Sequence, residues 1–155
     1  MKKLAKDIQR LLVNRHQTLA TAESCTGGRI AAALTAVAGS SGYFQGSLVA
    51  YQNEVKEHFL GVSSETIAKH DVVSREVVEE MVLGACRMFG TDYAIATTGY
   101  AGPGGGSADV PIGTIWIGAG NVEHMETLCL HESSTREKNL QHATEEALRL
   151  LLNQL

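Results

Sequence analysis

The sequence predicts a single-domain α/β sandwich in which helices flank a mixed, largely parallel sheet. Segments in which apolar residues recur at helical spacing alternate along the chain with short apolar runs of strand length. This alternation is typical of parallel strands joined by helical crossovers. Near the C-terminus, two strand-like runs flank Gly120 and Asn121, a pair that favours a hairpin turn and therefore antiparallel strands. No linker, repeat or low-complexity segment divides the chain, so residues 1–155 are expected to form one domain.

In the N-terminal half, a helix is expected at the start of the chain. Two strands are expected after it, one before and one after the first of two glycine-rich loops. Leu4, Ile8 and Leu11 recur at helical spacing, which predicts a helix over about the first fifteen residues. The run Gly-Ser-Ser-Gly at 39–42 is expected to end the second helix. The other elements predicted in this half are a strand over 18–22, a helix over 29–38, a strand over 47–51, a helical segment over 53–60 and a short one after 63–64.

In the C-terminal half, two helices are expected around three strands. Ser74 indicates a helix start, and Gly90 is expected to end that helix after Phe89. Ser134 is expected to cap the last helix. The strands predicted here cover residues 92–97, 113–119 and 122–131.

The composition excludes several classes of protein. Hydrophobic residues make up 44% and charged residues 19% of the 155 residues, a balance typical of globular domains. The formal net charge of −4 offers no basic surface, so no nucleic-acid partner is expected. No apolar run reaches the ~18 residues of a membrane span, and three cysteines without a C-x-x-C pair indicate a reducing compartment. The chain is therefore expected to be cytoplasmic, and its six histidines show no metal-ligand spacing.

The first glycine-rich loop follows a predicted strand and contains candidate catalytic residues. Ser24 and Thr26 lie at the strand end, just before helix amides expected near Gly27 and Gly28. Such amides bind phosphate or stabilise an oxyanion, although Ser24 or Thr26 could equally act as a simple helix cap. Cys25 is an alternative nucleophile, but no histidine is placed to activate it, and buried cysteine is commonly a small hydrophobe.

A second glycine-rich loop follows the strand over 92–97. The segment Thr97–Gly106 lacks the lysine of a P-loop, but its glycines favour close approach of the backbone to a ligand. A mobile surface loop is the alternative. Because ligand sites gather beyond the C-terminal ends of strands in α/β sheets, both loops are expected to face one crevice.

Tyr51 and Lys56 lie between the two loops, at a strand end and in the next helical turn. A desolvated lysine has a lowered pKa and can act as a base toward a serine. The alternative is a packed tyrosine and a solvated surface lysine.

Three ordered motifs give the sequence a specific resemblance. "TAESCTGG", "YQNEVK" and "TTGYAGPGGG" followed by "PIGTIWIG" resemble the C-terminal domain of the CinA competence/damage-inducible family, over nearly the whole chain. The resemblance implies an amidohydrolase that converts nicotinamide mononucleotide to nicotinate mononucleotide and ammonia, in pyridine nucleotide salvage. It also implies that the protein uses no cofactor or metal and self-associates.

The same resemblance assigns roles to individual residues. Ser24 corresponds to the family's nucleophile, and Tyr51 and Lys56 complete the catalytic centre. Arg136 corresponds to the residue that approaches the nucleotide phosphate. The residues then expected to contact substrate besides Arg136 are Cys25, Thr26, Gly27, Gly28, Thr98, Gly99, Gly102, Gly104 and Gly105.

Two positions depart from the family pattern. Tyr100 stands where the family usually has an aliphatic residue, and Leu140 stands where it often has a second arginine. These departures leave two alternatives open: a nucleotide-binding module without turnover, and an amidase for a different small amide.

Overall fold

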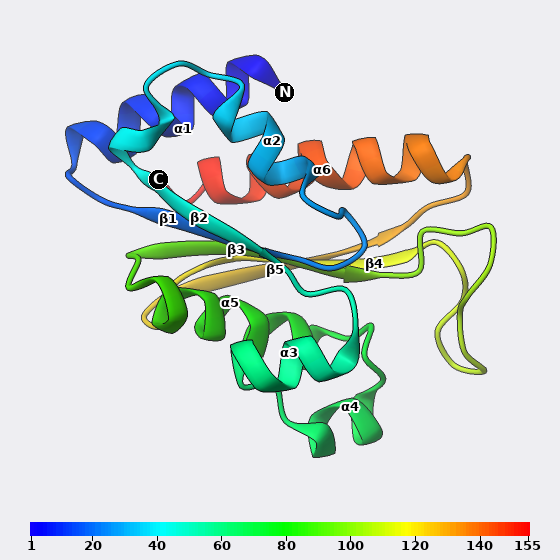
Figure 1. Ribbon diagram of the computed structural model, residues 1–155. Helices are drawn as coiled ribbons and strands as arrows, with labels where there is room; N and C mark the ends of the chain where they lie inside the picture. The colour runs from blue at the N-terminus through cyan, green and yellow to red at the C-terminus, as the bar shows by residue number, and fades with distance from the viewer.

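A five-stranded mixed sheet forms the middle layer of the protein, with helices on both faces (Figure 1). The computed structural model describes all residues, 1–155. Its elements, in chain order, are α1 (Lys2–Asn14), β1 (Leu19–Glu23), α2 (Arg29–Thr35), a 3-10 helix η1 (Ser40–Gly42), β2 (Phe44–Val49), α3 (Asn53–Leu60), α4 (Ser64–His70), α5 (Arg75–Phe89), β3 (Tyr93–Gly99), β4 (Thr114–Gly120), β5 (Met125–His131) and α6 (Arg136–Leu152).

The strand order β2-β1-β3-β4-β5 combines both kinds of pairing. β2, β1 and β3 are parallel, whereas β4 and β5 are added antiparallel at one edge. The chain leaves β1 for β2 on one side and later returns to pair β3 on the other side of β1. This reversal places the ends of β1 and β3 at a topological switch point, where α/β sheets bind ligands. The α/β fold with a mixed sheet is thus confirmed.

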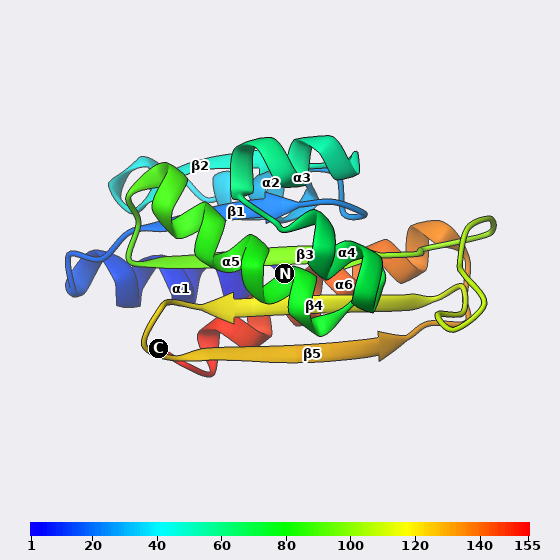
Figure 2. The same ribbon diagram turned by 90° about the horizontal axis from the view of Figure 1, so that it is seen from below.

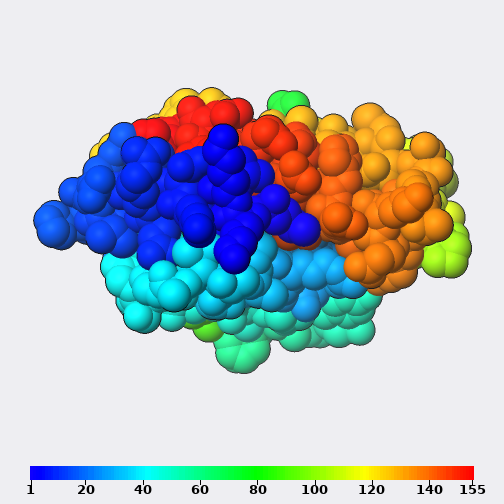
Figure 3. Space-filling view, turned by 90° about the horizontal axis from the view of Figure 1, so that it is seen from above, coloured from blue at the N-terminus to red at the C-terminus, as the bar shows by residue number.

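The helices divide into two layers with separate apolar cores. α1, α2 and α6 pack on one face of the sheet, and α5 packs on the other face with α3 and α4 against it (Figures 1 and 2). In the space-filling view of Figure 3, the N-terminal helix lies directly beside α6 on the outer surface. Leu12, Ile30 and Leu148 belong to the first core, while Leu60 and Met81 belong to the second. No helix has both the length and the apolar character that crossing a membrane requires.

Strand pairing moves one predicted element along the chain. The strand expected over 47–51 covers Phe44–Val49, because parallel pairing with β1 aligns Phe44 with Leu19 and Val49 with Glu23. Tyr51 therefore lies beyond the sheet rather than within it. The helix expected over 29–38 ends at Thr35.

Side-chain acceptors correct two further expectations. The cap of the last helix is Thr135, whose hydroxyl accepts from the Lys138 N–H, whereas the Ser134 N–H donates to the side chain of Asn139. The hairpin between β4 and β5 is longer than a two-residue turn. Residues 121–124 form it, because the Asn121 side chain accepts from the N–H groups of Glu123 and His124, and β5 begins only at Met125.

A glycine brings α3 close to α5. A Cβ built on Gly84 would lie 2.1 Å from the carbonyl oxygen of Leu60, the last residue of α3. A Cβ atom at this distance would displace the backbone of Leu60, so only glycine at position 84 allows α3 to pack this closely against α5. Because α3 carries Lys56, this contact bears directly on the position of that side chain.

We predict that Gly84→Ala lowers the free energy of unfolding by about 1–3 kcal/mol, the usual cost of overpacking a core. Urea denaturation measures the change. Met88→Ala, at an exposed position of the same helix, serves as the control and is expected to stay within about 0.5 kcal/mol of the wild type. Equal stability of the two variants would show that the α3–α5 contact is not constrained by Gly84.

Candidate active site

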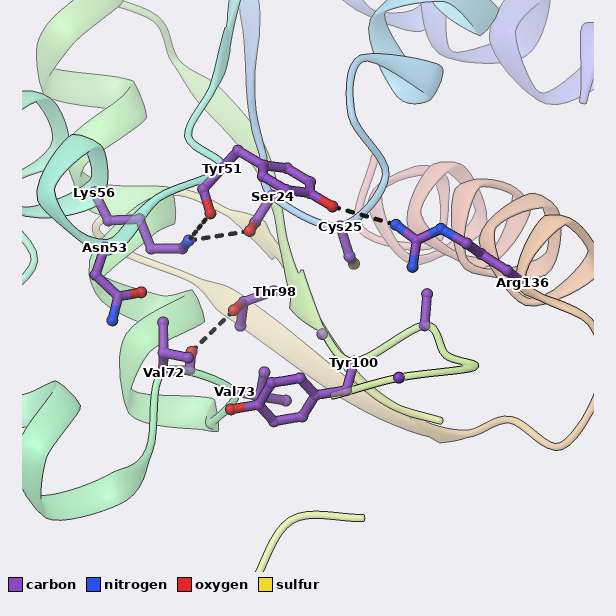
Figure 4. A pocket seen from close by; sticks show the side chains of 13 residues that line it. Ser24, Cys25, Tyr51, Asn53, Lys56, Val72, Val73, Thr98, Tyr100 and Arg136 are labelled. Atoms are coloured by element: carbon purple, nitrogen blue, oxygen red, sulfur yellow. Dashed lines mark hydrogen bonds between the residues drawn. The ribbon is translucent and has the colours of Figure 1, made fainter. Parts of the chain in front are cut away.

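A cavity of about 270 Å³ opens at the C-terminal ends of β1 and β3 (Figure 4). Ser24 follows β1, Thr98 and Gly99 end β3, and Lys56 comes from α3. Residues from both glycine-rich loops meet in this cavity. It is lined by Ser24, Cys25, Tyr51, Asn53, Lys56, Val72, Val73, Thr98, Gly99, Tyr100, Ala101, Gly104 and Arg136.

Ser24 is held at the first turn after β1. Its backbone N–H donates to the carbonyl of Thr97 at 3.0 Å, which extends the pairing of β1 with β3 by one residue. Its own carbonyl accepts from the Gly27 N–H, which closes the turn. The side chain is buried, with its hydroxyl in the cavity. The Ser24 hydroxyl is therefore presented to the cavity by a sharp turn, which strand pairing holds in place.

Lys56 reaches Ser24 from the other side of the cavity. Its Nζ lies 3.0 Å from the Ser24 Oγ and 3.3 Å from the carbonyl oxygen of Tyr51. The side chain is only 2% exposed and forms no ion pair with a carboxylate. Burial lowers the pKa of Lys56 from 10.5 to about 8, because an ammonium group loses its hydration there. The arrangement pairs a buried hydroxyl with an amine that gives up its proton easily.

The phenol of Tyr51 contacts Arg136 rather than the amine of Lys56. The Tyr51 side chain is 55% exposed, and its hydroxyl oxygen accepts from Arg136 Nη2 at 3.2 Å (Figure 4). Arg136 Nη1 donates to the carbonyl of Gly102 at 2.8 Å. Tyr51 thus meets Lys56 through its backbone carbonyl and Arg136 through its ring. Arg136 borders both this cavity and a neighbouring one.

Cys25 lies beside Ser24 but carries a thiol that resists ionisation. Burial raises its pKa from 9.0 to about 11, since a thiolate would be poorly solvated there. The nucleophilic form of cysteine is the thiolate. Because its thiol stays protonated, Cys25 is assigned to the cavity lining. The hydroxyl of Ser24 is the better candidate for the reacting group.

Glu23 binds amides at the start of α2, two to three residues beyond Gly28, where the sequence predicted amides free for a ligand near Gly27 and Gly28. Its two carboxylate oxygens accept from the N–H groups of Ile30 and Ala31, both at 2.9 Å, in the first turn of α2. They also accept from the hydroxyls of Thr21, Thr26 and Ser47, at 3.3, 2.8 and 3.5 Å. The start of α2 is therefore filled by the protein's own carboxylate, which is completely buried.

The expected substrate-binding residues fall into two groups. Cys25, Thr98, Gly99, Gly104 and Arg136 line the cavity. The Thr98 hydroxyl donates to the Val72 carbonyl and so ties the end of β3 to the segment before α5. The residues outside the cavity are Thr26, Gly27, Gly28, Gly102 and Gly105. The Thr26 hydroxyl is hydrogen-bonded to Glu23 and Thr97.

A second cavity, of about 580 Å³, adjoins the first at Ala101 and Arg136. Gly102 lines it, together with the three hydroxyl side chains of Ser133, Ser134 and Thr135 just before α6. Leu140, by contrast, faces away from both cavities and is buried in the apolar core. The position where the family often has an arginine therefore serves packing in this chain.

The sequence carries no signal for the residues whose role depends on distant partners. Glu23 stands within the quoted "TAESCTGG" motif, but nothing in the motif shows that its carboxylate caps α2. Val72 and Val73 reach the cavity from the segment before α5, and an apolar pair there carries no signal of a site. No group of three or more His, Cys, Asp and Glu side chains is arranged to hold a metal ion.

The fold and the site together define an α/β protein with a serine–lysine centre at the switch point of a mixed sheet. The CinA C-terminal domain matches the whole chain, residues 1–155. This chain therefore belongs to the CinA C-terminal domain family.

Characterised and structurally solved relatives agree with this assignment. A CinA-like protein of Cytophaga hutchinsonii is 43% identical over 148 residues, which is 96% of this chain and 35% of that protein. The chain thus spans about a third of the length of such CinA-like relatives. The nicotinamide-nucleotide amidohydrolase PncC of Escherichia coli is 46% identical over 114 residues, or 74% of this chain and 69% of that protein. The crystal structure of competence damage-inducible protein A from Klebsiella pneumoniae superposes with a TM-score of 0.94 at 38% identity, covering 98% of this chain and 94% of that one.

We predict that Glu23→Gln lowers the free energy of unfolding by about 1–3 kcal/mol, because the new NH₂ group faces donors and leaves them without an acceptor. Urea denaturation measures the loss. Glu79→Gln, a half-buried position on α5 without hydrogen-bond or ion-pair partners, is the matched control. If both variants unfold at the same urea concentration, the Glu23 network does not hold the turn.

Proposed function

We propose that this protein hydrolyses the carboxamide of nicotinamide mononucleotide to give nicotinate mononucleotide and ammonia, with Ser24 as the nucleophile. The observation that carries the proposal is the buried amine of Lys56, 3.0 Å from the Ser24 hydroxyl and without a carboxylate partner. The amidohydrolase PncC of Escherichia coli, at 46% identity, supports the choice of substrate.

In the first half of the reaction, neutral Lys56 takes the proton of the Ser24 hydroxyl as its oxygen attacks the carboxamide carbon. The carbonyl of Tyr51, 3.3 Å from Nζ, orients the amine throughout. The tetrahedral intermediate then collapses: the C–N bond breaks, and protonated Lys56 returns its proton to the nitrogen, which leaves as ammonia. An ester between Ser24 and the nicotinoyl carbon remains.

In the second half, water attacks this ester with Lys56 again acting as the base. The acyl C–O bond breaks, the proton returns to the Ser24 oxygen, and the carboxylic acid product loses its own proton to solvent. The backbone N–H of Cys25 donates to no backbone carbonyl, follows the nucleophile directly and belongs to a residue that lines the cavity, so it is the donor we assign to the oxyanion. One such donor is typically worth about 3–4 kcal/mol in the barrier.

The two adjoining cavities suit the two ends of a nucleotide. The amide end fits the smaller cavity around Ser24 and Lys56, and the ribose phosphate extends past Arg136 toward the hydroxyl-rich larger cavity. The guanidinium of Arg136 then exchanges its contact with the Tyr51 phenol for the phosphate, a bidentate interaction that arginine favours. A cytoplasmic location and a homo-oligomeric assembly remain predictions from the sequence and the family.

We predict that Ser24→Ala lowers kcat for ammonia release from nicotinamide mononucleotide by on the order of 10³-fold or more, since no other hydroxyl is hydrogen-bonded to Lys56 Nζ. Chromatographic detection of nicotinate mononucleotide measures turnover, and circular dichroism confirms the fold. Ser41→Ala, at an exposed position of η1, is the control and should retain wild-type turnover. Normal turnover by Ser24→Ala would rule out Ser24 as the nucleophile. A wild type that binds the nucleotide without releasing ammonia would instead identify a binding module.

The proposed base gives the reaction a defined pH dependence. Only neutral Lys56 accepts the serine proton, and burial places its pKa at about 8. We therefore expect kcat/KM to rise with pH through about 8 and then level, and to fall as pH drops and the amine becomes protonated. Stopped-time assays across this range measure the profile, and Lys56→Met should remove both the rising limb and most activity. A profile that is flat through pH 8, or that breaks near 10.5, would contradict this assignment.

A further inference from the structure

One carboxylate joins two segments of the cavity wall that lie far apart in the sequence. Asp71, which follows α4, accepts from the Tyr100 hydroxyl through Oδ1 at 2.9 Å and from the Ser107 hydroxyl through Oδ2 at 2.8 Å. Its Oδ1 also accepts from the Val73 N–H at 2.9 Å. Tyr100 and Val73 both line the cavity that contains Ser24, where Figure 4 shows the Tyr100 ring beside Val73. Asp71 thus fixes the position of one wall of the cavity without lining it.

The backbone of Asp71 adopts a conformation that other residues avoid. Its φ of 74° and ψ of 152° lie in a region that is essentially restricted to glycine. A side chain at such a position persists only where surrounding interactions over-determine it. The three hydrogen bonds to the carboxylate are those interactions, so the strain identifies the carboxylate as the reason that a side chain is present.

The second glycine-rich loop packs on the Tyr100 ring, which Asp71 holds in place. Ser107 pairs with Val110 through two hydrogen bonds, N–H to carbonyl at 2.8 Å and Val110 N–H to the serine hydroxyl at 3.2 Å. A Cβ built on Gly105 would lie 3.2 Å from the Tyr100 ring, so the loop backbone packs directly on it. Burial, followed by the contacts with Asp71, raises the pKa of Tyr100 to about 12, and the phenol stays a donor at physiological pH.

We infer that Asp71 is a positioning residue that holds the Tyr100 ring as an aromatic wall of the substrate cavity and orders the glycine-rich loop over it. A flat aromatic face favours stacking of a planar aromatic amide over an aliphatic one. The substrate preference rests on the proposed function, whereas the ordering of the loop does not.

The variant Asp71→Gly tests the inference without risking the fold, because glycine relaxes the strained backbone while removing the carboxylate. We expect an unchanged or higher Tm, and hydrogen exchange of the Ser107 and Val110 amides faster by about tenfold. For nicotinamide mononucleotide we expect KM to rise by about tenfold while kcat stays within about twofold, as for a lost binding interaction. Asp109→Asn, an exposed carboxylate of the same loop without hydrogen-bond partners, is the control and should match the wild type.

Two variants of Tyr100 separate the hydrogen bond from the ring. Tyr100→Phe keeps the ring and loses the donor, so it should raise KM less than Tyr100→Ile, which also reduces the preference for nicotinamide mononucleotide over an aliphatic amide. The results for Asp71→Gly decide the inference. Hydrogen exchange and KM equal to those of the wild type would overturn it. A lowered Tm with unchanged KM would also overturn it, because that result indicates a merely structural role. If the wild type hydrolyses no nicotinamide mononucleotide, the proposed function fails. Loop exchange in Asp71→Gly then decides the inference alone: faster exchange supports it and unchanged exchange overturns it.

Discussion

The site depends on a buried amine that has no opposite charge beside it. Lys56 is almost entirely shielded from water, and its nearest polar partners are the neutral hydroxyl of Ser24 and the carbonyl of Tyr51. An ammonium group in such surroundings loses hydration that two neutral dipoles only partly replace, so the neutral form becomes accessible near physiological pH. A carboxylate at the same distance would cancel this effect and convert the base into one half of an ion pair.

The buried carboxylate next to Ser24 in the sequence is hydrogen-bonded by other groups rather than by this amine. Glu23 immediately precedes Ser24, and its buried oxygens accept from two amides of α2 and three hydroxyls. These donors hold the carboxylate in place and orient it toward the helix. The carboxyl group of Glu23 and the amine of Lys56 therefore have opposite environments. Glu23 holds the turn, and Lys56 supplies the reactivity.

The cavity is assembled from segments that meet only at the switch point of the sheet. β1 and β3 bring Ser24 and Thr98 together, while the α3–α5 contact at Gly84 fixes the helix that carries Lys56. The remaining wall lies at the segment before α5. There Asp71 keeps a strained backbone and ties Tyr100 and Ser107 to the segment before α5. The Ser24–Lys56 pair thus depends on the sheet and on α3, whereas the remaining wall depends on one carboxylate.

The sequence by itself determined the alternation of helices and strands and the two glycine-rich loops, and it marked Ser24, Lys56 and Arg136 as candidates, because periodicity and motifs are local properties. Only the tertiary structure decided what each side chain contacts. Strand pairing shifted β2 and placed Tyr51 outside the sheet, where its phenol meets Arg136. The roles of Glu23 and Asp71 were hidden because hydrogen bonds to partners as distant as Ser47 and Ser107 depend on packing rather than on neighbouring residues. Local conformational preferences depend on short stretches of sequence. Desolvation and long-range hydrogen bonding, by contrast, arise only when the helices pack on the sheet.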